Sequence, residues 1–184
     1  MAGDGRLLKS VCVFCGANAG NRPLLAETAR ATGEALARRG VTLVFGGGRV
    51  GLMGAVSAAA RAAGGRVVGV IPAALQKKEL AYEGGDLSEL IVVRSMHERK
   101  ARMAELSDGF VALPGGFGTF EEICEMITWA QLGIHRKPCG AVNVAGYFDG
   151  LLGQFDRAVA DGLLRAGHRG LIVAESDPDR KSVV

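Results

Sequence analysis

The chain has 184 residues, of which 48% are hydrophobic, a size and composition that suit one compact domain with a substantial buried core. Its 22 basic and 19 acidic residues give a net charge of +3 and are interspersed, which disfavours a nucleic-acid groove. The first ten residues lack the apolar core of a signal peptide, and no apolar run approaches the roughly 18 residues of a membrane span. We therefore expect a soluble, cytoplasmic protein that binds neither nucleic acid nor a membrane.

Short apolar runs alternate along the chain with longer segments of helical periodicity. The expected strands are residues 10–14, 41–45, 66–71, 89–93, 109–113, 139–144 and 171–174. The expected helices are residues 23–39, 51–63, 96–107, 119–132 and 147–162, and residues 72–87 are expected to be irregular. Continuous apolar strands separated by helices indicate parallel pairing with both sheet faces covered.

The sequence thus predicts an α/β protein with a Rossmann-like, doubly wound, mainly parallel sheet and helices on both faces. We expect a single domain over residues 10–175, preceded by an extension at 1–9 and followed by a disordered tail at 176–184. The amphipathic stretch "ICEMITWAQL" (123–132) has enough apolar surface for a core or an interface, and for Trp129 the core is the safer expectation.

The four cysteines do not form a convincing metal site. Cys12 and Cys15 have C-x2-C spacing but lie within an apolar, strand-like run, and Cys124 and Cys139 are not a second close pair. We therefore expect reduced, mostly buried thiols and no metal.

Three glycine clusters each follow an expected strand: "CGANAG" (15–20), "GGGRVG" (46–51) and "PGGFG" (114–118). Doubly wound sheets bind ligands beyond the carboxyl ends of their strands, so these clusters are candidate ligand loops.

The second cluster spells G-x-G-x-x-G at Gly46, Gly48 and Gly51, between a strand and a helix, as a dinucleotide fingerprint requires. The acidic residue expected at the end of the next strand is missing, and nothing acidic follows until Glu79. A dinucleotide is therefore disfavoured. The glycines either let helix and strand pack closely or, through Gly46 and Gly47, serve a mononucleotide.

The third cluster places the amides of Gly115, Gly116, Gly118 and Thr119 at a helix N-terminus, where exposed N–H groups and the helix dipole favour an anion such as phosphate. A purely structural alternative is a capping box, with Thr119 as N-cap and Glu122 three residues later. The two roles could coexist on Thr119.

The segment "SMHERKARM" (95–103) opens another helix, with a further capping box in Ser95 and Glu98. Arg99 and Lys100 follow in its first turns, where the helix dipole disfavours positive charge. We expect a compensating anion there, and a solvated surface pair is the alternative. His97 alone is weak evidence for a general base.

The stretch "SMHERKARMAELSDGFVALPGGFGTFEEICEMITWAQLGIHRKP" resembles the LONELY GUY (LOG) family of cytokinin riboside 5′-monophosphate phosphoribohydrolases, whose signature pairs M-H-x-R-K with P-G-G-x-G-T-x-x-E. The similarity spans about residues 10–165. The resemblance implies a Rossmann-like homodimer with its pocket near the interface. It also implies hydrolysis of the N-glycosidic bond of a nucleoside 5′-monophosphate to free base and ribose 5-phosphate, without a cofactor.

Carried over by position, Arg99 and Glu122 match the catalytic pair of the family. The matching ligand-binding positions are Met96, Lys100 and the segment from Gly115 to Glu121, with a looser match at Glu79. Ala17 and Asn18 stand where many relatives have two serines, so a serine contact to the ligand is in doubt. Many similar sequences are labelled lysine decarboxylase, but no local motif indicates a pyridoxal-phosphate Schiff base.

Cleaving a nucleoside glycosidic bond develops positive charge on the ribose, which a carboxylate beside the sugar stabilises. We expect Glu122 to have this role, because Glu121 points about 100° away around the helix. Arg99 would fix the ribose or assist the leaving base. The 115–119 amides, helped by Lys100, would bind the phosphate, and this binding would position the sugar for the reaction.

Two other functions remain open from the sequence. One is a broader purine or pyrimidine nucleotide nucleosidase, with AMP or another common nucleotide as substrate. The other is a non-enzymatic nucleotide or molybdopterin carrier on the same scaffold. A metal-dependent phosphatase is disfavoured, because no aspartate or histidine cluster accompanies the glycine loops.

Overall fold

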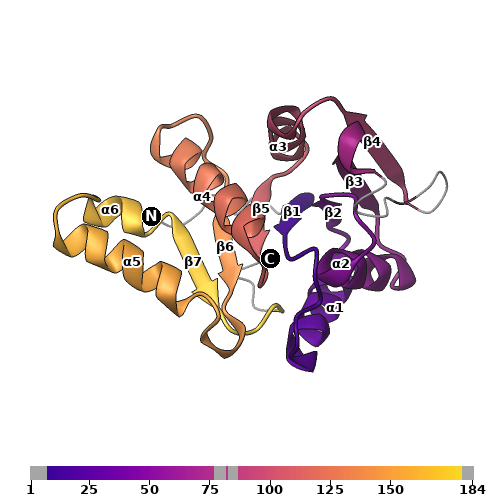
Figure 1. The fold of residues 1–184 in the computed structure, drawn as a ribbon, viewed down its shortest axis with the longest axis horizontal. Helices are drawn as coiled ribbons and strands as arrows, with labels where there is room; N and C mark the ends of the chain where they lie inside the picture. The colour runs from indigo at the N-terminus through magenta and orange to yellow at the C-terminus, as the bar shows by residue number, and fades with distance from the viewer. Residues whose placement is uncertain (1–7, 77–81, 83–86, 180–184) are drawn as a thin grey trace.

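The computed structural model describes residues 8–76, 82 and 87–179, within which seven strands form one sheet. Every neighbouring pair of strands is parallel, and the order is β4-β3-β2-β1-β5-β6-β7 (Figure 1). The strands are β1 (Ser10–Phe14), β2 (Thr42–Phe45), β3 (Val67–Pro72), β4 (Glu89–Val93), β5 (Gly109–Ala112), β6 (Cys139–Val142) and β7 (Ile172–Glu175). The predicted parallel α/β sheet is confirmed.

Six α-helices and two short 3₁₀-helices connect the strands within the described residues. They are α1 (Pro23–Arg38), α2 (Gly51–Ala62), η1 (Ala73–Leu75), α3 (Met96–Glu105), α4 (Phe117–Gln131), η2 (Val144–Gly146), α5 (Asp149–Ala160) and α6 (Ala166–Arg169). All the predicted strands and helices are present, with small shifts at their ends. The short η1, η2 and α6 were not predicted, because a single turn leaves little periodic signal.

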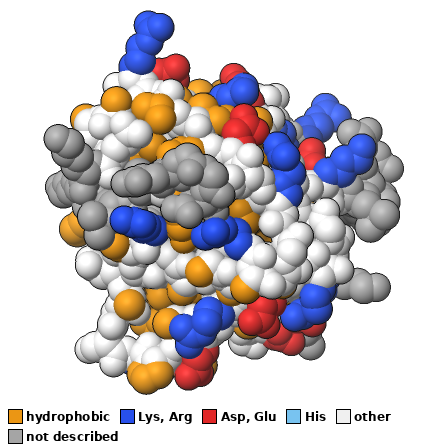
Figure 2. All heavy atoms as spheres, turned by 90° about the vertical axis from the view of Figure 1, so that its right-hand side faces the viewer, with side chains coloured by type: hydrophobic (Ala, Val, Ile, Leu, Met, Phe, Trp, Pro, Cys, Tyr) orange, Lys and Arg blue, Asp and Glu red, His pale blue; other side chains and the backbone are white. Residues whose placement is uncertain are grey.

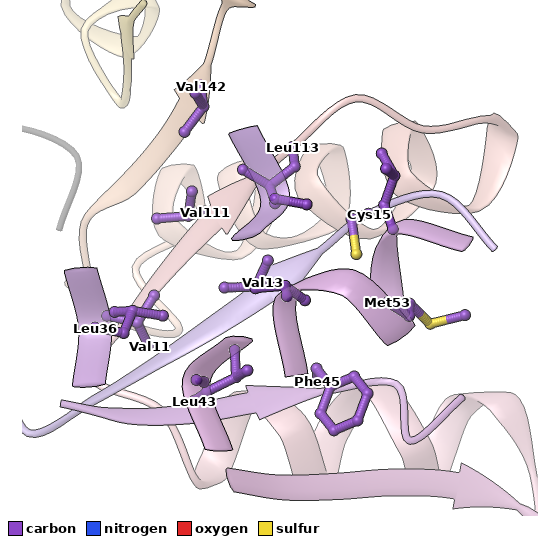
Figure 3. Close-up of a cluster of buried hydrophobic side chains, with 14 of the residues drawn as sticks. Val11, Val13, Cys15, Leu36, Leu43, Phe45, Met53, Val111, Leu113 and Val142 are labelled. Carbon is purple, nitrogen blue, oxygen red and sulfur yellow. The ribbon is translucent and has the colours of Figure 1, made fainter. Parts of the chain in front are cut away.

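The side chains of β1 alternate between two cores, one on each face of the sheet, because successive residues of a strand point to opposite sides. Val11, Val13 and Cys15 pack with buried side chains of α1 and α2, among them Leu36 and Met53 (Figure 3).

On the other face, Cys12 and Phe14 pack with Met103 of α3 and with buried residues of α4. Burial of this kind on both faces is the main stabilising contribution to such a sheet. Trp129 is half-buried and packs against this second core, as expected from the sequence.

The topology creates a crevice beside the central strand. From β1 the chain builds outward through β2 and β3 to β4, and then returns to place β5 on the other side of β1. Phe14 at the end of β1 pairs with Ala112 at the end of β5, so the loops after these two strands leave from neighbouring points. One leads to α1 and the other to α4, on opposite faces of the sheet. Such a reversal of strand order is where doubly wound sheets bind their ligands.

All four cysteines are free, and Cys12, Cys15 and Cys139 are buried while Cys124 is half-buried, as predicted. Burial raises the pKa of the Cys139 thiol to about 12, which keeps it protonated near neutral pH. These thiols are packing groups of the two cores.

None of the helices in the described part of the chain is long and apolar enough to cross a membrane. On the face formed by β3, β4 and α2, basic and acidic side chains are interspersed (Figure 2). The predicted extension at 1–9 and tail at 176–184 lie mostly outside the described residues.

Candidate active site

A cavity of about 530 Å³ lies at the carboxyl edge of the sheet, where the strand order reverses. Its wall is formed by residues 13–20 in and after β1, by Gly46 after β2, by most of the 114–119 loop, and by side chains of α2, α3 and α4. All three glycine clusters therefore contribute to one site, as their positions after strands predicted.

The cavity brings together most of the site residues predicted from the sequence. Those that line it are Gly46, Met96, Arg99, Gly115, Gly116, Gly118, Thr119, Glu121 and Glu122. Gly47 and Lys100 are absent from the described lining. Glu79 lies outside the described residues. His97 is exposed and is likewise absent from that lining.

The glycine loop leads into the N-terminus of α4, which begins at Phe117 with Gly116 as its N-cap. The alternative interpretation of Thr119 as an N-cap is wrong, because the helix begins two residues before Thr119. That residue is instead buried in the first turn. Gly116 has no side chain, so the N-cap itself supplies no side-chain hydrogen bond to α4. The amides of a first helical turn lack intrahelical partners, and here they open onto the cavity wall, where they and the helix dipole favour an anion.

Arg99 enters the cavity from the first turn of α3 and is held by the backbone of two strands. Its Nε donates to the carbonyl oxygen of Val70 at 3.1 Å, and its Nη2 donates to the carbonyl oxygen of Gly46 at 2.7 Å. Its side chain is buried, so these charge-assisted bonds fix the guanidinium at the ends of β2 and β3.

The predicted cap at the start of α3 is confirmed. Ser95 Oγ accepts from the Glu98 amide at 3.1 Å. Glu98 Oε2 in turn accepts from the amide of Arg94 at 2.8 Å, one residue earlier than in the usual capping box. The two bonds fix the first turn of α3 and therefore the direction in which Arg99 leaves it.

Glu122 is half-buried in α4 and lines the same cavity as Arg99. Both charges act on the thiol of Cys15 in the cavity wall. Burial and then the Glu122 carboxylate raise the pKa of Cys15 well above its ordinary value, whereas Arg99 lowers it. An anion and a cation therefore lie close to one point of the wall.

Lys100 extends toward α4 and is absent from the described lining of the cavity. Its ammonium forms ion pairs with Glu121 and with Glu125, the latter at 3.0 Å. Burial alone would lower the pKa of Lys100, but the hydrogen bonds with these two carboxylates outweigh it and raise that pKa. The expected compensating anion is thus supplied by the protein, and the alternative of a solvated surface pair is wrong, because Lys100 is buried.

The G-x-G-x-x-G segment serves close packing. The first amides of α2, at Leu52 and Met53, donate to the carbonyl oxygen of Gly16 at 3.0 and 3.4 Å. Gly51 has a φ of +59°, and a Cβ there would lie 2.3 Å from the carbonyl carbon of Ala17. The N-terminus of α2 is therefore used to hold the loop after β1, which favours the packing interpretation over a nucleotide at these amides.

Sequence reasoning missed several residues of the wall, of which Leu75 and Tyr147 lie furthest in the sequence from the glycine clusters and from residues 95–103. The Tyr147 hydroxyl donates to the carbonyl oxygen of Gly115 at 2.5 Å. Its position shortly after β6, at the same edge of the sheet, is the signal that could have identified it. Ala17 and Asn18, which stand at the serine positions of relatives, also line the cavity.

The fold and the cavity define a doubly wound α/β protein with a pocket at its topological switch point. A family described as "possible lysine decarboxylase" matches residues 53–182. A probable cytokinin riboside 5′-monophosphate phosphoribohydrolase of Oryza sativa subsp. japonica is 53% identical over 176 residues, which cover 96% of this chain and 76% of that protein. A cytokinin riboside 5′-monophosphate phosphoribohydrolase of Arabidopsis thaliana is 49% identical over 176 residues, which cover 96% and 75%. The chain belongs to this LOG family, and the resemblance found in the sequence is confirmed.

Solved structures with the same architecture include the molybdenum cofactor carrier protein of Chlamydomonas reinhardtii. Its TM-score is 0.68 at 22% identity, covering 92% of this chain and 90% of that one. The molybdenum cofactor binding protein of Rippkaea orientalis has a TM-score of 0.64 at 22% identity, covering 92% and 89%. At these identities the likeness concerns the fold alone, and it confirms the predicted Rossmann-like class.

Proposed function

We propose that the protein hydrolyses the N-glycosidic bond of a nucleoside 5′-monophosphate and releases the free base and ribose 5-phosphate. The observation that carries this proposal is the single cavity in which the glycine loop, Arg99 and Glu122 meet. Relatives that are about half identical over nearly the whole chain are named for this reaction on cytokinin riboside 5′-monophosphates.

The phosphate binds at the N-terminus of α4. The amides of the glycine loop and the dipole of a 15-residue helix favour an anion there, and glycine lets that anion approach the backbone closely. Binding energy from the phosphate, remote from the bond that breaks, then positions the sugar in the cavity.

Glu122 acts on the ribose. As the glycosidic bond breaks, positive charge develops at the anomeric carbon and the ring oxygen, and a carboxylate in the cavity wall stabilises it. The same carboxylate orients or deprotonates the attacking water. Glu121 is less suited to this role, because its carboxylate is paired with Lys100 and its side chain is 53% exposed.

Arg99 supplies a fixed positive charge in the same cavity wall. Because the carbonyl groups of Gly46 and Val70 hold its guanidinium, the charge needs little reorganisation during the reaction. From this position Arg99 holds the ribose hydroxyls or stabilises the negative charge that develops on the departing base.

Lysine decarboxylation, the activity in the family description, would require pyridoxal phosphate held by a lysine as a Schiff base. The part of the cavity wall that the structure describes contains no lysine. Lys100, the residue after Arg99, is paired with Glu121 and Glu125. These residues do not fit a pyridoxal-phosphate site.

We further propose that the protein is a cytoplasmic homodimer with its pocket near the interface. The support is an exposed aromatic side chain beside the pocket: Phe117, between Gly116 and Gly118 of the glycine loop, is 94% exposed. Leu132 and Ile134, just beyond the end of α4, are also largely exposed. Light scattering tests the dimer, and full activity of a monomer at nanomolar dilution would contradict a shared pocket.

The reaction is tested by incubating the protein with AMP and, separately, with isopentenyladenosine monophosphate, and separating the products by chromatography. Free base with ribose 5-phosphate from either nucleotide supports the proposal, and their relative rates identify the preferred base. Release of inorganic phosphate would indicate a phosphatase instead. Binding of nucleotide without any product would favour a carrier.

A further inference from the structure

We propose that Tyr147 is a positioning residue for the glycine loop 114–119 and thereby sets the affinity of that loop for the substrate phosphate. This inference rests on the function proposed above. Tyr147 lies outside the motifs that carry the family resemblance and comes from the segment after β6, yet it lines the cavity. Its hydroxyl donates to the carbonyl oxygen of Gly115 at 2.5 Å.

The turn that carries Tyr147 is fixed by hydrogen bonds. Asn143 Oδ1 accepts from the amide of Phe148 at 2.7 Å, and Asn143 Nδ2 donates to Asp149 Oδ1 at 2.7 Å. Ala145, between these residues, has a φ of +51°, a conformation that a residue other than glycine adopts only where its surroundings impose it. The turn therefore holds Tyr147 in a defined direction.

The ring of Tyr147 is fixed as well. It lies edge-on to Phe148 with ring centroids 5.2 Å apart, and stacks near Phe120 at 6.4 Å. Phe148 is buried in the core, and Phe120 is the residue of α4 that follows Thr119. The aromatic contacts thus connect the turn after β6 to the first turn of α4, which follows the glycine loop in the chain.

The glycine loop is held from two sides by bonds to its backbone. On one side the amide of Gly16 donates to the carbonyl oxygen of Pro114 at 3.0 Å, and on the other Tyr147 donates to that of Gly115. A donor on the Gly115 carbonyl also polarises the peptide unit that it shares with the Gly116 amide, at the N-cap of α4. That amide becomes a better donor to an anion, and the loop is preorganised before the nucleotide arrives.

Replacing Tyr147 by phenylalanine keeps the ring contacts and removes only the hydroxyl. We expect the KM for AMP and the inhibition constants of ribose 5-phosphate and inorganic phosphate to rise together, by about three- to tenfold, the range for one lost hydrogen bond. The kcat should change by less than about twofold, because the hydroxyl contacts the loop and not the bond that breaks.

The matched control is Tyr82→Phe. Tyr82 is buried, whereas Tyr147 is 38% exposed, and the Tyr82 hydroxyl likewise has a polar partner, Ser57 Oγ at 3.0 Å. Tyr82 is absent from the described lining of the cavity. This variant should keep the wild-type affinity for phosphate. Circular dichroism and thermal unfolding verify that both variants are folded.

Titration calorimetry of the full chain with inorganic phosphate separates this inference from the proposed reaction. Weaker phosphate binding by Tyr147→Phe than by the wild type and by Tyr82→Phe supports the role of Tyr147, even if neither test nucleotide is hydrolysed and the proposed reaction fails. Equal phosphate affinity of all three proteins overturns the inference, as does a wild type that binds no phosphate. A fall in kcat at unchanged KM would also overturn it, because it would place the hydroxyl in the chemical step.

Discussion

Arg99 and Gly46 fit each other so closely that a side chain at position 46 would displace the guanidinium or the backbone that holds it. The Nη2 atom of Arg99 donates to the Gly46 carbonyl oxygen at 2.7 Å, and a Cβ on Gly46 would lie 2.1 Å from the same nitrogen. No side chain tolerates such a contact, so any larger residue must move the guanidinium or the end of β2. The absence of a side chain at the end of β2 thus sets the position of a charge in the cavity.

We therefore predict that Gly46→Ala impairs catalysis by displacing Arg99. The kcat/KM should fall by about a hundredfold, the scale of an approximately 1 Å misplacement of a positioned group. The free energy of unfolding should fall by about 1–3 kcal/mol through overpacking. Steady-state kinetics and urea unfolding measure the two effects.

Gly153→Ala is the matched control for this substitution. A Cβ on Gly153, in α5, would meet no atom within 4 Å. This variant should keep full activity and gain about 0.5–1 kcal/mol from the better helix propensity of alanine. Wild-type kinetics in Gly46→Ala would show that the exact position of the Arg99 guanidinium is not needed for the reaction.

Glu122→Gln tests the carboxylate assigned to the ribose. The amide has the shape of the carboxylate but carries no charge and is a poor base, so turnover should fall at least about a hundredfold while the fold is kept. Single-turnover release of free base from AMP, followed by chromatography, measures the chemical step directly.

The control for this variant is Glu125→Gln, one turn further along α4. Glu125 is absent from the described lining and is paired with Lys100, which also retains its ion pair with Glu121. Its turnover should remain close to that of the wild type. Equal turnover of Glu122→Gln and Glu125→Gln would exclude Glu122 from the mechanism.

Much of the fold was predictable because its signals are local. Continuous apolar strands such as "SVCVF" alternate with helices of clear periodicity, and that alternation implies a parallel sheet. The rule that ligands bind at the carboxyl ends of strands then placed the three glycine clusters at one edge. The roles proposed for Arg99 and Glu122 came from the family resemblance, because spacing alone does not distinguish a catalytic arginine from a surface one.

The missed features depend on contacts between segments distant in sequence. The bond from Tyr147 to Gly115 joins residues that are 32 positions apart and meet only because β5 and β6 are neighbours. The ion pairs of Lys100 with Glu121 and Glu125 could not be read from the sequence, because they depend on the packing of α3 beside α4. The helix α4 begins at Phe117, before the predicted start, so Thr119 lies in its first turn and is not its cap. The predicted helix started after the glycines of the loop, but these glycines do not prevent helix formation, and Gly118 lies within α4.

Lys100→Met should destabilise the fold, because it leaves the carboxylates of Glu121 and Glu125 without their common cation. The methionine keeps most of the buried stem. The unfolding free energy should fall by about 1–3 kcal/mol, less than for a fully buried pair because Glu121 is half exposed to solvent. Urea unfolding near neutral pH measures the loss.

The pH dependence of that loss has a defined sign. Because the folded protein raises the pKa of Lys100, the ion pairs stabilise the fold below the unfolded value of about 10.4. Their contribution is lost as the pH rises through the higher folded value. The difference between wild type and Lys100→Met should therefore shrink above about pH 10.4. A difference that is constant across this range would contradict the assignment of the stabilisation to the charge of Lys100.

Asp108→Asn should affect stability without affecting catalysis, because Asp108 lies at the opposite edge of the sheet from the cavity. Its Oδ2 accepts from the amides of Lys9 and Ser10 at 2.9 and 3.1 Å and from Ser10 Oγ at 3.2 Å, which ties the turn before β5 to the start of β1. Burial alone would raise the pKa of Asp108, but these bonds, with a contribution from the charge of Lys137, outweigh it and lower that pKa.

Because its folded pKa is lowered, the Asp108 carboxylate stabilises the fold above the unfolded value of about 3.9, and this contribution is lost as the pH falls through the lower folded value. Asp108→Asn should therefore lower the unfolding free energy at pH 7 by about 0.5–1 kcal/mol, a small effect because the carboxylate is exposed. The difference in unfolding free energy should shrink as the pH is lowered from 5 toward 3, as urea unfolding at several pH values would show.

The kcat and KM of Asp108→Asn should equal those of the wild type. A change in either would mean that the amino edge of the sheet is coupled to the cavity, and a stability difference that persists at low pH would mean that the charge of Asp108 is not its source.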